Sequence, residues 1–383
     1  MVLMNRYLNI MVPGIFLPLS LGTVYNFSQY SANIAQLFEI TKFQTDIGFT
    51  LIIFFLGMSA AVFGRFIEMF PKRMSIVSTI LFAAGMLTMF ISTSFQILPL
   101  YYIACMLLGS GTGIGYCVPV KQLLANFIDH AGFASGLCIC GFGCGKFVAA
   151  PIIEYLLSAV SLPMMFLILS GLFLVVMSTC SWLFRPNPAF ISTKYTIIPY
   201  KDLVKTKFLT KEYISIWLMF CINISCGLAL ISQEKLLFLN AGFTEIAILM
   251  ALTAVANVGG RFGMSTASDN IGRKCAYHWI ASFGLLGAFL CYTQMPILLI
   301  IGVLLIEFNY GACFSCLPSL LAKRFGSSCL STVHSMTLTG WSFGGIFGPL
   351  LANMFTGNTL FLVLGMLYII GFGGFTICVK RDK

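Results

Sequence analysis

The sequence is poor in charged residues. Only 9% of its 383 residues are Asp, Glu, Lys or Arg, whereas a soluble globular domain carries about 25%. Hydrophobic residues make up 59%, and the mean hydropathy is +0.96. Such a chain cannot cover a water-facing surface. These values exclude a soluble protein and predict one whose surface contacts lipid.

Features of several other protein classes are also lacking. The formal net charge is +10, but no basic stretch is interleaved with aromatic residues, so nucleic acid is not expected as a partner. Most of the 14 cysteines lie inside apolar runs, which favours packing residues over a redox or zinc site. The C-x-x-C of Cys313 and Cys316 lies in a predicted helix and is interpreted in the same way. Neither a metal nor a cofactor is expected.

The first apolar run does not resemble a cleavable signal. It is long enough to span a membrane, contains Pro13, Gly14 and Pro18, and is not followed by a clear small-residue cleavage site. We therefore interpret it as the first membrane helix.

Apolar runs of about 20 residues, the length that spans a bilayer, recur along the chain. Cutting at polar or Gly/Pro breaks predicts twelve spans: 8–30, 46–66, 73–94, 97–121, 132–157, 162–184, 213–233, 244–266, 275–293, 296–320, 329–353 and 358–379. The longest interruption divides them into two sets of six. We predict an all-α membrane protein with a six-helix bundle over 1–184, a cytoplasmic linker over 185–212 and a second six-helix bundle over 213–383.

The basic residues predict the orientation, because cytoplasmic loops are enriched in Lys and Arg. With the N-terminus inside, 19 of the 22 basic residues lie at cytoplasmic ends, and both termini are cytoplasmic. The outer ends hold only Lys42 and Lys235, and Lys146 lies within a helix. The 19 residues are Arg6, Arg65, Lys72, Arg73, Lys121, Arg185, Lys194, Lys201, Lys205, Lys207, Lys211, Arg261, Arg273, Lys274, Lys323, Arg324, Lys380, Arg381 and Lys383. Which membrane the protein occupies stays open.

The two sets of six spans repeat each other. The G-R-F-I-E-M-F-P-K-R stretch at 64–73 and the S-T-A-S-D-N-I-G-R-K stretch at 265–274 align an acid, a turn residue and a basic pair at an offset of 201. Pro119 and Pro318 align at an offset of 199, and Pro151 and Pro349 at 198. Three coincidences at nearly one offset indicate duplication. Parallel repeats of six helices, with a substrate site between them near mid-bilayer, are a transporter architecture.

These residues carry a resemblance to the major facilitator superfamily over essentially the whole chain. The acid–turn–basic motif is that superfamily's loop signature and is present in both expected places. The copy at 268–274 is nearly ideal, whereas the copy after the second span has Glu68 for Asp and Pro71 for Gly. The resemblance implies a carrier with two pseudo-symmetric six-helix bundles around a central cavity.

Within that superfamily the chain looks most like the oxalate/formate antiporter-like branch, a relative of the monocarboxylate porters. The motifs that carry this resemblance are G-T-V-Y-N-F-S at 22–28, G-T-G-I-G-Y at 111–116, G-F-G-C-G at 141–145 and L-P-S-L-L-A-K-R-F-G at 317–326. One position departs from it. Where the oxalate exchanger has a lysine before a glycine in helix 11, this chain has Thr339 before Gly340, which weakens oxalate as the substrate.

Three charges within predicted spans need an explanation, because a charge at the bilayer centre costs roughly 2.5–3.5 kcal/mol on insertion scales. Lys146 lies about 21 Å along the fifth span, past the middle of a roughly 30 Å core. Arg261 lies about 12 Å above the loop that follows the eighth span. The resemblance implies that this arginine binds a substrate carboxylate, for which a planar guanidinium is suited. The alternatives for Lys146 are neutralisation by a buried acid or deprotonation, and the alternative for Arg261 is an inner gate pair with Asp269 or another loop acid.

Glu307 is the third charge, about 16 Å from the outer end of the tenth span. It is interpreted either as the partner of Lys146 or Arg261, or as a proton carrier. Tyr25 and Tyr116 match tyrosines that line the family's cavity, although aromatic packing explains each of them, taken alone, at least as well. The weaker substrate-binding candidates are Asn309, Tyr310, Thr339 and Trp341. The gating-motif candidates are Glu68 with Arg73 and Asp269 with Arg273.

Two apparent motifs do not predict enzymes. The G-W-S-F-G stretch at 340–344 matches a hydrolase pattern, but it lies in a helix, and the only histidines, His130, His278 and His334, lie near cytoplasmic ends. Gly145-Lys146 lacks the other residues of a phosphate loop. An enzyme is therefore not expected, because no catalytic constellation is present.

We expect a secondary transporter of a small organic anion, a mono- or dicarboxylate, that works by alternating access in the lipid bilayer as a monomer. Antiport and proton symport both stay open, since Glu307 is available for protons. The alternatives are a carrier of a neutral or cationic solute and a membrane sensor that uses the same fold without transport.

Overall fold

The computed structural model describes residues 2–186 and 198–379, and this part of the chain is helical without strands. Four of the basic residues predicted to be cytoplasmic lie outside the described residues, as does part of the expected linker: Lys194, Lys380, Arg381 and Lys383. The helices before this gap are α1 (Val2–Leu21), α2 (Phe27–Phe38), α3 (Lys42–Met69), α4 (Pro71–Phe95), α5 (Leu98–Asn126), α6 (Ala131–Ala159) and α7 (Leu162–Leu183). Those after it are α8 (Tyr200–Leu203), α9 (Lys211–Asn240), α10 (Ile246–Gly259), α11 (Ser265–Ile271), α12 (Arg273–Tyr292), α13 (Pro296–Phe325), α14 (Leu330–Thr337), α15 (Thr339–Met354) and α16 (Gly357–Cys378).

Eleven stretches of the described residues are long and apolar enough to cross a membrane. The twelfth expected span, 329–353, is present as two shorter helices, α14 and α15, separated at Leu338. The hydroxyl of Thr337 donates to the Val333 carbonyl at 2.8 Å, and that of Thr339 to the Met336 carbonyl at 2.7 Å. These bonds to neighbouring carbonyls flank the break. The result is the all-α membrane fold that the hydropathy predicted.

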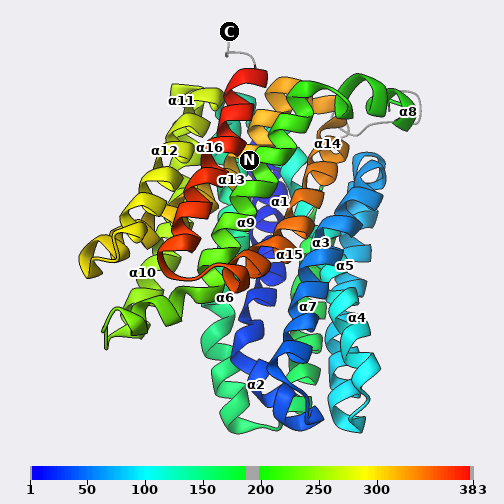
Figure 1. Ribbon diagram of the computed structural model, residues 1–383. Helices are drawn as coiled ribbons and strands as arrows, with labels where there is room; N and C mark the ends of the chain where they lie inside the picture. The colour runs from blue at the N-terminus through cyan, green and yellow to red at the C-terminus, as the bar shows by residue number, and fades with distance from the viewer. Residues whose placement is uncertain (1, 187–197, 380–383) are drawn as a thin grey trace. The chain divides into compact units, whose positions relative to one another are not determined.

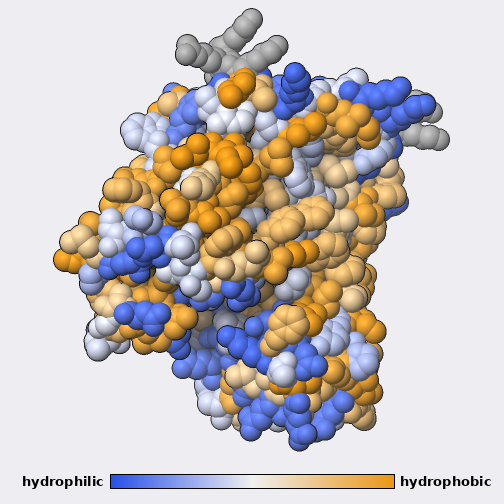
Figure 2. Space-filling view, viewed as in Figure 1, coloured by the Kyte–Doolittle hydropathy of each residue, from blue (hydrophilic) through white to orange (hydrophobic). Residues whose placement is uncertain are grey.

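Apolar side chains cover the outer sides of the helices. Val62, Ile80 and Val175 are each more than half exposed, as are Phe289 and Ile370. Figure 2 shows hydrophobic residues over much of the helix sides, with hydrophilic ones near helix ends. A water-facing protein rarely exposes large contiguous apolar surfaces, whereas such surfaces are typical of helices that cross a membrane. The chain is an integral, multi-pass membrane protein.

The chain divides into two compact units. The first comprises the described parts of Met1–Asn126, Cys138–Ile197 and Ser328–Ser342, and the second those of Phe127–Leu137, Ile198–Ser327 and Phe343–Lys383. The first unit therefore contains α14 and the start of α15, and the second contains the first turns of α6. In the first unit, α3, α4 and α5 lie side by side (Figure 1).

Glycines allow the helices of the first unit to touch. A Cβ on Gly113 of α5 would lie 1.9 Å from the Leu56 carbonyl oxygen of α3, so only glycine fits there. Gly57 and Gly64 likewise bring α3 against α14 and the α14–α15 break, because a Cβ on Gly57 would lie 2.4 Å from the Leu338 oxygen. Small residues are the usual means by which membrane helices approach closely.

Two spans contain irregular turns beside candidate residues. Between α1 and α2 the chain forms a 3₁₀ segment, Gly22–Asn26, which carries Tyr25. Between α10 and α11 it forms a π-helical segment, Gly260–Met264, which carries Arg261. A π-bulge inserts one residue into a helix and is frequent at functional sites.

The turns of the two loop motifs differ in a way that explains their different residues. Gly272 joins α11 to α12 with a φ of +88°, a conformation that favours glycine. In the other copy the chain turns at Phe70 with a φ of −132°, and Pro71 occupies the first turn of α4, where proline is well tolerated. The two sequences therefore reach the same helix–turn–helix connection by different backbone routes.

Candidate functional site

The candidate residues of the second unit centre on Arg261. Its side chain is buried, with 2% of its surface exposed, and its guanidinium carbon lies 5.3 Å from the ring centre of Phe314. The Nε group donates to the Asn257 side-chain oxygen at 2.8 Å, and the Asn257 amide donates to Glu307 at 2.8 Å. Arg261 and Glu307 are thus joined through Asn257 in a buried polar chain.

This chain gives Arg261 and Glu307 a shared environment. Both side chains are buried, Glu307 with 4% of its surface exposed. Buried charges in membrane helices occur in pairs or facing a polar cavity. Asp269, the loop acid considered as an inner gate partner, instead pairs with Arg273. Sequence reasoning missed Asn257, although a polar residue one helical turn before Arg261 within an apolar run is a detectable signal.

The other two candidates of α13 lie in the packed interior of the second unit. Asn309 accepts from the Asn223 amide at 2.9 Å and donates to the Tyr368 hydroxyl at 3.1 Å. Tyr310 is buried, with its ring 5.1 Å from that of Phe314. The side-chain amide of Asn309 is thus hydrogen-bonded to residues of two other helices. Tyr310 packs on Phe314, the ring that Arg261 also contacts.

In the first unit, several candidate residues surround Phe142 of α6. The ring centre of Phe142 lies 5.6 Å from that of Tyr25, 5.2 Å from that of Tyr116 and 5.9 Å from that of Trp341. The structure therefore brings together three candidates that are far apart in the sequence. Phe142 itself was not predicted, although it lies in the glycine-rich stretch 141–145.

Lys146 follows Phe142 by four residues and so lies on the same face of α6. The Lys146 side chain is exposed, and its backbone oxygen accepts from the Asn26 amide at 3.1 Å. Thr339 lies at the start of α15, and its hydroxyl donates to the Met336 carbonyl of α14 across the break between the two helices. Lys146 is therefore one helical turn from Phe142, the residue around which Tyr25, Tyr116 and Trp341 pack.

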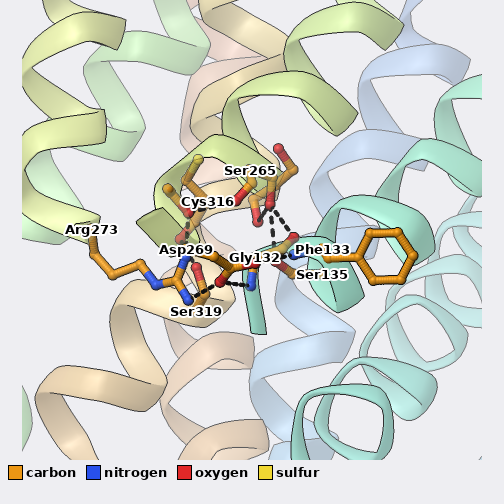
Figure 3. Close-up of polar contacts among 10 residues, drawn as sticks. Gly132, Phe133, Ser135, Ser265, Asp269, Arg273, Cys316 and Ser319 are labelled. Atoms are coloured by element: carbon orange, nitrogen blue, oxygen red, sulfur yellow. Dashed lines mark hydrogen bonds and ion pairs between the residues drawn. The ribbon is translucent and has the colours of Figure 1, made fainter. Parts of the chain in front are cut away.

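The loop motif at Asp269 anchors the start of α6 (Figure 3). The Asp269 carboxylate accepts from the backbone N–H groups of Gly132 at 2.7 Å and Phe133 at 2.9 Å, and it also pairs with Arg273. A carboxylate at the first turn of a helix satisfies free N–H groups and the positive end of the helix dipole. Ser265 adds a bond to the Gly132 carbonyl at 2.6 Å.

The first copy of the motif has the same geometry with different basic partners. Glu68 is buried, forms an ion pair with Lys121 of α5 and accepts from the Thr332 backbone N–H in the first turn of α14 at 3.2 Å. Arg73, expected to act with Glu68, instead lies with its guanidinium carbon 5.2 Å from the Phe70 ring centre. In both copies the acid of the motif holds the N-terminus of another helix.

Metal-ligating side chains do not gather in groups within the described residues. Cys313 and Cys316 are buried thiols on α13, in keeping with a packing role.

Comparison with known proteins places this fold in a family. The Major Facilitator Superfamily model matches residues 2–349. The chain belongs to this superfamily. It is a transporter of the superfamily and not an enzyme, and the resemblance inferred from the sequence motifs is confirmed.

Two relatives have similar sequences. The chain is 24% identical over 335 residues to the uncharacterized MFS-type transporter YhjX of Escherichia coli (strain K12), covering 85% of this chain and 83% of that protein. It is 23% identical over 393 residues to the oxalate:formate antiporter of Oxalobacter formigenes, covering 98% and 92%. Among solved structures, the E. coli fucose:proton symporter has the same fold, with a TM-score of 0.72 at 14% identity over 97% of this chain and 98% of that one.

Proposed function

We propose that this superfamily member is a secondary active transporter of a small organic anion, a mono- or dicarboxylate. It works by alternating access between its halves, 1–184 and 213–383, which the linker 185–212 joins. The observation that carries the proposal is the buried chain of Arg261, Asn257 and Glu307 at a π-helical turn. The oxalate:formate antiporter among its relatives supports a carboxylate as the class of substrate.

Arg261 is suited to a carboxylate because its guanidinium is planar and offers donors in a fork. The bond from Nε to Asn257 and the contact with Phe314 fix the orientation of that fork. In the absence of substrate, Glu307 balances the charge of Arg261 through Asn257. A substrate carboxylate that binds Arg261 takes over this role.

The protonation state of Glu307 then determines whether anion transport is coupled to a second anion or to a proton. If the protein exchanges one anion for another, Glu307 stays ionised and each substrate leaves as the next one binds. If the protein is a proton symporter, Glu307 takes up a proton when the substrate displaces it from the charge of Arg261, since a buried carboxylate that loses its countercharge is costly.

Lys146 supplies a second positive charge, from the other half of the sequence. It lies one turn from Phe142, whose neighbours Tyr25, Tyr116 and Trp341 offer polar groups and rings to a small polar substrate. In the second unit, Tyr310 packs on Phe314, as Arg261 does, and it is proposed to contact the substrate there. The acids Glu68 and Asp269, with Arg73 and Arg273 close by in their motifs, are proposed to stabilise one state of the transport cycle.

Ligand-induced thermal stabilisation of the purified protein tests the substrate class. A ligand that binds only the folded protein stabilises it by about 2.7 kcal/mol at a concentration of 100 Kd. We expect at least one of formate, acetate, oxalate and succinate to raise the midpoint of unfolding, and Arg261→Ala to remove that increase. Stabilisation by a neutral sugar or an amine, with none by any carboxylate, would contradict the proposal.

Transport into proteoliposomes distinguishes the two modes of coupling. Collapse of the pH gradient abolishes accumulation of the anion in a proton symporter and leaves counterflow unchanged in an exchanger. Glu307→Gln is expected to remove the dependence on the pH gradient in the first case only.

A further inference from the structure

His334 of α14 is a buried titratable residue that the proposed transport site does not use. Its side chain is 1% exposed, and its ring centre lies 6.1 Å from that of Tyr116. Within the described residues, its Nε2 atom has no hydrogen-bond partner, and neither do the hydroxyl groups of Ser331 and Thr332. Buried polar atoms are normally bonded, so each exception needs an explanation.

Only the neutral form of His334 fits this environment. A protonated ring donates from both nitrogens, and its Nε2–H has no acceptor among the described residues. The positive charge would also be buried without a countercharge of its own, which is strongly unfavourable.

The charged groups near this part of α14 do not supply that countercharge. Glu68 of α3 is already paired with Lys121 of α5 and accepts from the Thr332 N–H. Arg65 precedes Glu68 by one turn on α3. Two cations, Arg65 and Lys121, therefore lie on the helices around a single acid, Glu68. The remaining titratable groups on this stretch of α5, Tyr116 and Cys117, carry no charge near neutral pH.

We propose that His334 couples protons to the transport cycle: its ring is neutral while α14 packs against α3 and α5, and Nε2 binds a proton from water when α14 separates from them. The inference rests on alternating access as the proposed function. Because Glu68 holds the first turn of α14, separation of α14 also breaks the Glu68–Thr332 bond. Loss of the Glu68–Thr332 bond and protonation of His334 therefore occur in the same movement. Low pH favours the state in which α14 is separated from α3 and α5.

The size of the effect follows from linkage. A histidine exposed to water has a pKa of about 6.5. If only the separated state binds the proton, the equilibrium constant for separation increases about tenfold between about pH 8 and about pH 5.5.

Hydrogen–deuterium exchange of the full-length protein in nanodiscs, without any added substrate, tests this inference. The peptide 330–337 is followed at both pH values, with labelling times adjusted for the pH dependence of chemical exchange. In the wild-type protein, we expect the equilibrium constant for opening of this peptide to be about tenfold larger at the lower pH. We expect no such increase in His334→Gln or His334→Asn. A peptide from α7 serves as the internal reference.

The other two histidines provide matched controls. His130 is exposed, and His278 lies on α12 with its Nε2 3.2 Å from the Thr376 hydroxyl, so His130→Gln and His278→Gln should behave like the wild-type protein. The inference is wrong if the wild-type peptide shows no pH dependence, or if the dependence persists in both His334 variants. It is also wrong if Glu68→Gln alone removes the dependence while the His334 variants keep it. Since no substrate is added, the result is independent of whether a carboxylate is carried.

Discussion

The bonds of Asp269 predict how strongly the second loop motif holds the first turn of α6. Its carboxylate accepts from two backbone N–H groups in the first turn of α6 and pairs with Arg273, and all of these groups are largely buried. Asp269→Asn keeps one acceptor oxygen, but it replaces the other with an NH₂ group and removes the charge. One charge-assisted bond to α6 is lost, and Arg273 stays buried without its countercharge.

The expected loss follows from these changes. A hydrogen bond to a charged group contributes about 1.5–3 kcal/mol, and removal of one partner of a buried ion pair costs about 3–5 kcal/mol. We therefore expect Asp269→Asn to weaken the attachment of the first turn of α6 by about 3 kcal/mol or more, a factor of at least about one hundred in its opening equilibrium.

Hydrogen–deuterium exchange of the peptide 131–137 measures this attachment directly. Where reclosing is faster than chemical exchange, the peptide should exchange about one hundred times faster in Asp269→Asn than in the wild-type protein. Asp202→Asn, which changes an exposed acid of α8, should leave it unchanged. Equal exchange in Asp269→Asn and the wild-type protein would refute the reasoning.

Three further predictions concern packing, the first motif and the substrate site. Gly113→Ala should lower the midpoint of thermal unfolding by an amount that corresponds to about 1–3 kcal/mol, because its Cβ has no room against the α3 backbone. Gly171→Ala, where nothing lies within 4 Å of the added Cβ, should leave the midpoint nearly unchanged, and equal effects would contradict this account. Lys121→Met should destabilise the protein by about 3–5 kcal/mol in the same assay, since it leaves Glu68 buried without its partner. Adding Glu68→Gln should recover part of that loss, and a double variant less stable than Lys121→Met would count against it. Arg261→Lys should reduce carboxylate uptake at least about tenfold in proteoliposomes, because an ammonium does not replace the planar fork; wild-type uptake would show that the fork is not used.

The hydropathy of the sequence predicts most of the fold, because a chain in lipid must satisfy its backbone polar groups within helices. Eleven of the twelve expected spans meet the length and hydropathy of a membrane helix. The exception, 329–353, has the composition of a span but contains a break at Leu338. Hydropathy averages over about 20 residues and does not register a single altered hydrogen bond.

The local geometry of the candidate site depends on contacts between distant segments, which the sequence alone does not specify. The motif acids were found from their spacing, but Lys121 as the partner of Glu68 comes from another helix. The π-helical turn at Arg261 and the Asn257 link to Glu307 likewise follow from packing of α10 against α13. Phe142 was missed because an aromatic residue in an apolar run has no distinguishing spacing.

Uptake of labelled carboxylates by proteoliposomes that contain the purified protein tests the central claim most directly. We expect saturable uptake of at least one small mono- or dicarboxylate by the wild-type protein, and its loss in both Arg261→Ala and Lys146→Ala. Carboxylate uptake that persists in both variants would contradict the claim that these two cations bind an anionic substrate.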